Sequence, residues 1–290
     1  MSWRIVVVSS SAKLDYQMGY LVVRKDTTVK VHISEISVLV IESTAVALTS
    51  ALLSELVKKK VKVIFCDEKR NPLSELIPYY GAHDTSNKVR KQIGWSAEIK
   101  ATVWTEIVTE KIRKQKENLL YFHKEEYALL QQYIEEIEFG DITNREGHAA
   151  KVYFNALFGK DFIRTDDSII NAALNYGYSI ILSVFNREIA ANGYLTQIGL
   201  FHDNMFNPFN LASDFMEPFR TIVDREVYRN RFSEFERKEK LCLVNLLNKE
   251  VRMANRIETV NNAIKLYCRS IFDALDANDV SLIKFFDYEL

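Results

Sequence analysis

The stretch SVLVIESTAVALTSALLSELVKKKVKVIFCD (residues 37–67) contains two runs of β-branched residues with a helical pattern between them. The runs SVLVIES and VKVIFCD have the composition of buried strands. Between them, Leu48, Leu52 and Leu56 recur at helical spacing, and the lysines at 58–60 suit the negative end of a helix dipole. The stretch therefore predicts two strands and one helix that covers their sheet.

Three further runs of similar composition lie upstream of this stretch. They are WRIVVVSS (3–10), GYLVVRKD (19–26) and TVKVHIS (28–34). We therefore expect residues 1–72 to form a β-rich domain, similar to a β-sandwich, with one covering helix. Residues 73–87 contain Pro78, Gly81 and the polar run HDTSN, which is typical of a linker.

From residue 88 onward the apolar residues follow a helical period. Helices are expected over 88–118, 120–138, 144–158 and 167–192, with another starting near 211 and two more before the C-terminus. The expected fold class is α+β, with residues 88–290 forming a larger all-α domain. Its longest irregular interval, 193–210, is a candidate functional loop, because long irregular segments in compact domains often carry function.

The composition excludes several classes of protein. Hydrophobic residues make up 48% of the 290 residues, with only nine glycines and four prolines, which argues against a disordered chain. The three cysteines form no CxxC pair, so neither a disulfide framework nor a zinc knuckle is indicated. No apolar stretch approaches the roughly 18 residues that a membrane span needs. We therefore expect a soluble cytoplasmic protein.

The net charge of −1 gives no global signal for nucleic acid, so local basic patches must carry that case. One patch lies between residues 85 and 120 and begins with Lys88, Arg90 and Lys91. A second group of arginines begins at Arg220. These four residues are candidate DNA contacts, although charge runs on helices are often only solvated faces.

The segment Thr143–His148 (TNREGH) is the first candidate for chemistry. Asn144 is a good N-cap, and Glu146 in the following turn suits the positive end of the helix dipole, so a purely structural role explains both residues. Gly147 is unusual, because glycine in a helix costs about 1 kcal/mol relative to alanine unless something must approach the backbone closely.

The second and third candidates are close together in the sequence. His202 lies in the long irregular interval, where a histidine is either a surface residue or a ligand. Asp214 and Glu217 are three residues apart and share one helix face, which requires a cation or a basic partner. Arg220 could be that partner, and Pro218 favours a helix start or kink beside the two acids.

These segments resemble the signature of the CRISPR-associated Cas1 integrases. GLFHDNMFNPFNLASDFMEPFRTIVD (199–224) is similar to their histidine followed by an acid-x-x-acid helix, and NREGHAAKVYFNALFG (144–159) is similar to the block with their first catalytic glutamate. The similarity extends over essentially the whole chain. NREGHAA and SDFMEPFR look most like the type II version found beside the Cas9 effector.

The resemblance implies that Glu146, His202 and Glu217 bind a metal ion and form the catalytic set, with Asp214 as an auxiliary acid. Many family members carry aspartate where Glu217 stands, and many carry proline where Thr221 stands, but neither change removes a type of ligand. Carboxylate ligands suit Mg²⁺ or Mn²⁺, and the imidazole tilts the site toward Mn²⁺.

The activity implied is metal-dependent joining of DNA 3′-hydroxyl ends into a CRISPR array, with endonuclease activity when water is the nucleophile. The partners implied are double-stranded DNA, a homodimer, a small Cas2 dimer that bridges two such dimers, and other adaptation proteins of the same subtype. Two alternatives remain open from the residues alone. One is a metal-independent acid/base hydrolase that uses Glu146 and Glu217, and the other is a non-enzymatic DNA-binding scaffold.

Overall fold

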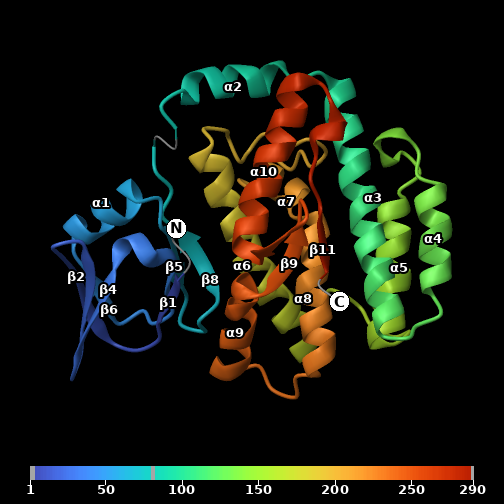
Figure 1. The fold of residues 1–290 in the computed structure, drawn as a ribbon. Coiled ribbons are helices and arrows are strands. Elements are labelled where there is room, and N and C mark those ends of the chain that lie inside the picture. Colours follow the sequence, from blue (N-terminus) through green and yellow to red (C-terminus); the bar gives the residue numbers. More distant parts are fainter. Residues whose placement is uncertain (1–3, 80–81, 289–290) are drawn as a thin grey trace. The chain divides into compact units, whose positions relative to one another are not determined.

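A computed structural model describes residues 4–79 and 82–288, and within it the chain divides into two compact units between His83 and Asp84 (Figure 1). The division lies inside the expected linker, 73–87.

The N-terminal unit contains the five expected strands and three that the sequence did not indicate. Its elements are β1 (Arg4–Val8), β2 (Ala12–Gln17), β3 (Tyr20–Arg24), β4 (Thr28–His32), β5 (Ile36–Ile41), β6 (Val46–Leu48), α1 (Ser50–Lys58), β7 (Lys62–Cys66) and β8 (Pro72–Glu75), with a short 3₁₀ turn at Ile33–Glu35. Thr49 accepts a hydrogen bond from the amide of Leu52 at 3.3 Å and so begins α1 after β6. The expected helix is therefore shorter, because Val46–Leu48 pairs with β2 as a strand.

Two four-stranded sheets form this unit. One has the order β1-β5-β7-β8, with parallel pairing except between β7 and β8, and the other has the order β4-β3-β2-β6. Every residue of β5 is buried, as expected for a strand inside a parallel sheet. One apolar core joins both sheets and α1, with Leu14 and Leu21 from one sheet, Leu39 and Val63 from the other, and Leu52 from the helix.

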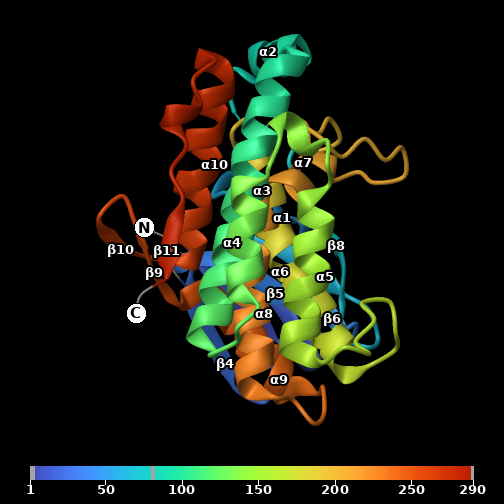
Figure 2. The same ribbon diagram turned by 90° about the vertical axis from the view of Figure 1, so that its right-hand side faces the viewer.

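The C-terminal unit is mostly helical, and α3, α4 and α5 lie side by side in it (Figures 1 and 2). Its helices are α2 (Thr85–Gly94), α3 (Ala97–Tyr121), α4 (Tyr127–Glu135), α5 (Arg145–Phe158), α6 (Ile169–Ala191), α7 (Asn210–Phe215), α8 (Glu217–Asn230), α9 (Arg237–Val244) and α10 (Val260–Ala277), with short 3₁₀ turns at Phe139–Asp141, Asn245–Asn248 and Val280–Leu282. Helix α6 contacts α7, α8, α9 and α10, so it is central to the packing.

The expectation of an all-α unit was wrong. Strands β9 (Glu250–Met253), β10 (Arg256–Thr259) and β11 (Phe286–Tyr288) form a small antiparallel sheet in the order β10-β9-β11. These strands have three or four residues each, which is too short for an alternating pattern to stand out. Ala254 and Asn255, both at positive φ, make the turn between β9 and β10.

Several helix boundaries also differ from the expected ones. The helix expected over 88–118 is two helices, because Ser96 caps a new one by accepting a hydrogen bond from the amide of Ile99 at 3.2 Å. Helix α4 starts at Tyr127 rather than 120, after a turn with His123 at positive φ. The helix expected near 211 is interrupted at Met216, and Pro218 lies in the first turn of α8, as expected for proline at a helix start.

No helix in the part of the chain that the structure describes is long and apolar enough to span a membrane.

Candidate active site

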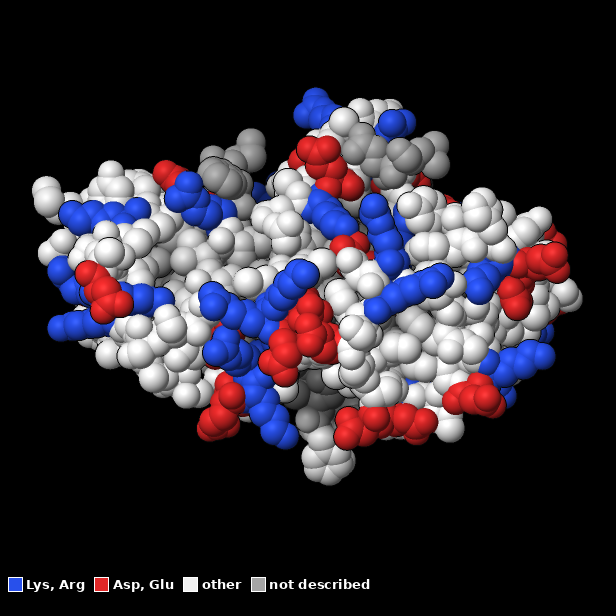
Figure 3. Space-filling model, turned by 90° about the horizontal axis from the view of Figure 1, so that it is seen from below, with Lys and Arg blue, Asp and Glu red and all other residues white. Residues whose placement is uncertain are grey.

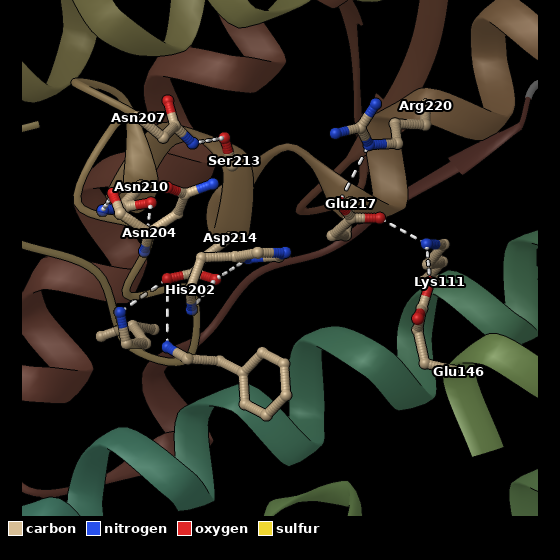
Figure 4. Close-up of polar contacts among 12 residues, drawn as sticks. Lys111, Glu146, His202, Asn204, Asn207, Asn210, Ser213, Asp214, Glu217 and Arg220 are labelled. Atoms are coloured by element: carbon tan, nitrogen blue, oxygen red, sulfur yellow. Dashed lines mark hydrogen bonds and ion pairs between the residues drawn. The ribbon is translucent and has the colours of Figure 1, made fainter. Parts of the chain in front are cut away.

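The candidate residues come from four segments of the C-terminal unit: helix α3, the start of α5, the loop that precedes α7, and the helix pair α7–α8. Figure 4 shows Glu146, Lys111 and Glu217 in a line, with His202 and Asp214 on the neighbouring loop and helix. The site is thus assembled from positions more than 100 residues apart in the sequence.

Glu146 is fixed at the start of α5 by two capping side chains. Asp141 accepts hydrogen bonds from the amides of Arg145 at 2.7 Å and Glu146 at 3.1 Å. Asn144, which has a left-handed backbone at φ 53°, accepts one from the amide of Gly147 at 3.3 Å. The N-cap role expected of Asn144 is confirmed, and the helix start holds the Glu146 side chain in place.

The cap also explains Gly147. A Cβ atom at this position would lie 2.8 Å from the Oδ1 atom of Asn144, closer than such contacts occur. The glycine therefore leaves room for the Asn144 side chain over the first turn. The group that approaches the backbone closely at Gly147 is this side chain.

Asp214 organises the loop that carries His202. Its fully buried carboxylate accepts hydrogen bonds from the amides of Leu200 (2.6 Å), Phe201 (3.2 Å) and His202 (3.1 Å). The Nδ1 atom of His202 lies 2.5 Å from the Oδ1 atom of Asp214. Because Asp214 uses both oxygens in this way, it positions the loop and the imidazole.

Gly199 makes this arrangement possible. A Cβ atom there would lie 2.3 Å from the carbonyl oxygen of His202 and 2.8 Å from the Oδ2 atom of Asp214. The hydrogen bond to Asp214 raises the pKa of His202, although partial burial opposes it. The ring of Trp104 stacks on Phe201 at 4.5 Å and meets the edge of the His202 ring at 5.8 Å, so aromatic contacts also hold the imidazole.

Lys111 joins the two glutamates. Its ammonium group donates to the Oε1 atom of Glu146 and to the Oε2 atom of Glu217. The other carboxylate oxygen of Glu217 accepts from the Nε atom of Arg220 at 2.9 Å. Burial alone would raise the pKa of Glu217, but Arg220 and Lys111 outweigh burial and lower it to about 2. Burial opposes the charged form of Lys111, but Glu217 and Glu146 prevail and raise its pKa.

The side chains of Glu146, Glu217 and His202 are of the types that bind divalent cations. Glu146 and Glu217 converge on a single positive charge, which Lys111 supplies. His202 lies on the adjacent loop, and its charge and that of Glu217 influence each other. Within residues 4–79 and 82–288, however, no three His, Cys, Asp or Glu side chains are already grouped as a metal site. The structure therefore unites the two glutamates and places His202 with Asp214.

The candidate DNA contacts fall into two groups. The Nζ atoms of Lys88 and Lys91 lie 3.5 Å and 3.1 Å from the Oδ2 atom of Asp276 on α10, while Arg90 is exposed. Arg220 pairs with Glu217 and lies over the ring of Tyr178, 4.8 Å from its centroid. Figure 3 shows basic side chains interspersed with acidic ones on the face in view, in agreement with the near-zero net charge.

Two lysines that lie within the basic patch, residues 85–120, are buried. Lys111 has 8% of its side chain exposed, and Lys114 is fully buried with Glu117 and Asp287, both at 3.0 Å. Lys111 is a functional candidate that reasoning from sequence missed. Its spacing could have indicated that it is buried. Lys111 follows Ile107 by four residues and Val108 by three, so it lies on the same buried face of the helix.

Comparison with known proteins gives one family. The model described as CRISPR associated protein Cas1 matches residues 5–254. A protein named CRISPR-associated endonuclease Cas1 from Neisseria meningitidis serogroup C (strain 8013) is 34% identical over 234 residues, which cover 78% of this chain and 75% of that protein. The likeness to the type II version agrees with this relative.

Two solved structures share the fold. A casposase bound to integration product has a TM-score of 0.77 and 19% identity, and the match covers 96% of this chain and 92% of that one. A chain of a Cas6-RT-Cas1--Cas2 complex has a TM-score of 0.74 and 18% identity, and the match covers 97% of this chain but only 36% of that longer one.

Proposed function

This chain belongs to the CRISPR-associated Cas1 family, and from that premise we propose that it is an integrase that joins 3′-hydroxyl ends of short DNA segments into a CRISPR array. An endonuclease activity follows when water replaces the hydroxyl. The relative from Neisseria is named an endonuclease, and the casposase with the same fold was captured on its integration product. Both support DNA strand chemistry.

One observation supports the proposed chemistry most: Glu146 and Glu217 converge on one positive charge. Glu146, Glu217 and His202 would hold Mg²⁺ or Mn²⁺, which suit carboxylate and imidazole ligands. A divalent cation there would supply Lewis-acid stabilisation of phosphoryl oxygens and lower the pKa of the attacking hydroxyl.

The remaining residues act by position and charge. A carboxylate only accepts, so the Nδ1–H group of His202 donates to Asp214, and the Nε2 atom is left as the ligand or proton acceptor. Asp214 therefore sets the tautomer and orientation of the imidazole. Arg220, beside Glu217, adds positive charge where a phosphate would carry negative charge.

We further propose the partners that such a reaction needs. The substrates are double-stranded DNA, both the incoming segment and the CRISPR repeat. The active form is a homodimer, with a small Cas2 dimer bridging two such dimers and other adaptation proteins of the same subtype able to join. The Cas6-RT-Cas1--Cas2 complex with a related fold supports the Cas2 partnership. The chain would act in the cytoplasm, where the array lies.

The charges argue against Glu217 as the acid of a metal-independent acid/base hydrolase. That reaction needs one carboxyl group with a raised pKa as the acid. Lys111 and Arg220 instead lower the pKa of Glu217 to about 2 despite its burial, so this carboxyl stays ionised at neutral pH. Activity on a glycoside in the presence of EDTA would favour the hydrolase.

The proposal is tested by strand joining with Mg²⁺ or Mn²⁺ in Glu146→Gln, His202→Ala and Glu217→Gln variants. Joining should fall by at least a hundredfold in each, while DNA affinity changes little, because Arg and Lys contacts to phosphates supply most of it. Full joining in all three variants refutes the assignment. Normal array expansion in cells that carry Glu146→Gln would favour the scaffold alternative.

A further inference from the structure

The segment from Tyr194 to His202 has no regular secondary structure, although it carries the imidazole of the candidate site. A backbone outside helices and sheets needs other partners for its amide and carbonyl groups, and a segment without them opens easily. One side chain from a distant helix supplies several of these partners. It is Gln92 on α2, which is only 2% exposed.

Gln92 makes three hydrogen bonds to the backbone of this segment. Its Oε1 atom accepts from the amide of Leu195 at 2.8 Å. Its Nε2 atom donates to the carbonyl oxygens of Leu195 at 2.9 Å and Ile198 at 3.0 Å. These contacts need an acceptor and two donors on one planar group, and a primary amide has both, whereas a carboxylate lacks the donors and an ammonium group lacks the acceptor.

The contacts of Gln92 adjoin those of Asp214 along the chain. Gln92 bonds to residues 195 and 198, and Asp214 bonds to the amides of residues 200, 201 and 202. Only Gly199 separates the two sets of contacts. Glycine has the freest backbone of all residues, so a segment held on one side alone would turn about this position. Gln92 therefore fixes the side of the loop that Asp214 does not reach.

Helix α2 and the start of the loop share one partner on α10. The carboxylate of Asp276 accepts a hydrogen bond from the Nε1 atom of Trp95, which follows α2, at 3.2 Å. The same carboxylate accepts one from the hydroxyl group of Tyr194 at 3.1 Å. The rings of Trp95 and Tyr194 also pack together, with 5.4 Å between their centroids. Gln92 thus lies on a helix that is itself fixed beside the loop.

We propose that Gln92 is a positioning residue for strand joining. It holds the backbone of residues 195–198, so that Asp214 keeps the imidazole of His202 in one orientation and one tautomer. Gln92 bonds to the backbone of the loop and not to the imidazole, so its effect on the reaction passes through the loop. The inference rests on the proposed function, because it assumes that His202 takes part in the reaction.

The first measurement follows the imidazole directly. Long-range proton–nitrogen NMR spectra of the full chain with labelled histidine report the tautomer of each neutral ring at alkaline pH, and His202→Ala identifies the signal of His202. Gln92→Met removes all three hydrogen bonds and keeps a side chain of similar length. Wild type should show His202 as the Nδ1–H tautomer, and Gln92→Met should show a mixture of the two tautomers.

The second measurement is strand joining in Mn²⁺ at saturating DNA. Gln92→Met should lower kcat by about ten- to a hundredfold, because small displacements of a reacting group have effects of this size. The Kd for DNA should change by less than about twofold, because Arg and Lys contacts supply most of the affinity. Gln92→Asn keeps the amide but is one methylene shorter, so it should lose activity in the same direction, and it replaces Gln92→Met if circular dichroism shows that the latter does not fold.

Asn171→Leu is the matched control. Asn171 is 3% exposed, and its Nδ2 atom donates to the carbonyl oxygens of Ile163 and Asp166, both at 2.8 Å, so this amide holds a different loop in the same manner. The substitution should lower the melting temperature as Gln92→Met does but leave the tautomer of His202 unchanged.

Three results overturn the proposal: a single His202 tautomer in Gln92→Met, an equal change of tautomer in Asn171→Leu, or wild-type kcat in both Gln92 variants. The NMR measurement needs neither DNA nor metal. A wild-type protein that fails to join DNA therefore refutes the proposed function, while the tautomer of His202 still decides whether Gln92 positions the imidazole.

Discussion

The ammonium group of Lys111 on α3 forms an ion pair with the carboxylate of Glu217, the first residue of α8, and both side chains are more than 90% buried. The same ammonium group also pairs with Glu146. A lysine therefore stands where two candidate metal ligands meet. Any cation that binds both glutamates must displace this internal positive charge, so Lys111 should oppose metal binding and stabilise the metal-free protein.

We expect Lys111→Met to lower the stability of the metal-free protein and to increase its stabilisation by Mn²⁺. Removing one partner of a buried ion pair costs about 3 to 5 kcal/mol, because the other charge stays buried. Mn²⁺ would replace the lost positive charge, so the rise in melting temperature with added Mn²⁺ should exceed that of wild type. Thermal unfolding with and without Mn²⁺ measures both effects.

Lys114→Met is the matched control, since Lys114 is a buried lysine on the same helix that pairs with Glu110, Glu117 and Asp287 instead of Glu146 and Glu217. It should also destabilise the protein, but Mn²⁺ should not compensate. Equal Mn²⁺ responses in Lys111→Met and wild type would contradict a competition between the lysine and the metal.

Gly147→Ala should destabilise the protein even though alanine favours helices. A Cβ atom at residue 147 would push the Asn144 side chain from its cap, and the loss of a cap costs about 1 kcal/mol. Gly94, the last residue of α2, has open space around a Cβ atom, so Gly94→Ala should instead raise the free energy of unfolding by about 0.5 to 1 kcal/mol. Urea unfolding compares the two variants.

A double substitution separates the clash from other effects. In an Asn144→Ala background the side chain that Gly147 accommodates is gone, so Gly147→Ala should become neutral or stabilising. If the alanine is equally harmful with and without Asn144, the cap does not explain the glycine.

Asp224→Asn should flatten the pH dependence of stability. Burial raises the pKa of Asp224 to about 7, and Tyr178 donates a hydrogen bond to its carboxylate. A carboxyl group with a raised native pKa binds its proton more tightly in the folded state, so the free energy of unfolding falls as pH rises from about 4 to about 7. Relative to wild type, Asp224→Asn should therefore gain about 2 to 4 kcal/mol between pH 4 and pH 8.

Urea unfolding across that pH range provides the measurement, with Asp273→Asn, an exposed carboxylate on α10, as control. The control should keep the wild-type slope. Parallel curves for wild type and Asp224→Asn would show that Asp224 is ionised throughout.

Most of the fold follows from local patterns. The strands β1, β3, β4, β5 and β7 and the long helices α5 and α6 have strong periodicity, and the sequence predicts them. The short strands could not be predicted in this way, because three or four residues are too few to show an alternating pattern. Strands β9 and β11 also pair residues that are far apart in the sequence, Met253 and Phe286, which are 33 residues apart. Their pairing is decided by tertiary packing.

The contacts of the proposed site residues were only partly predictable from the sequence. The family resemblance proposed Glu146, His202, Asp214 and Glu217, and spacing on the helix indicated Arg220 as a basic partner of the acids. That pair is present, yet the ion pair that joins Glu146 to Glu217 comes from Lys111, on a helix far away in sequence. Such contacts depend on how α3, α5 and α8 pack, which no local pattern records.

Helix α2, at the start of the C-terminal unit, carries the candidate DNA contacts Lys88, Arg90 and Lys91. Each phosphate contact from a basic side chain contributes about 0.9 to the slope of log affinity against log salt for duplex DNA. Lys88 and Lys91 share Asp276, which reduces their local charge, whereas Arg90 is exposed. Arg90→Ala should therefore flatten the slope by about 0.9, and Lys88→Ala and Lys91→Ala by less.

Asp276→Asn frees both lysines, so it should steepen the slope and tighten DNA binding at low salt. Titrations by fluorescence anisotropy at several salt concentrations give these slopes, and a slope that is unchanged in all four variants places the DNA path elsewhere on the protein.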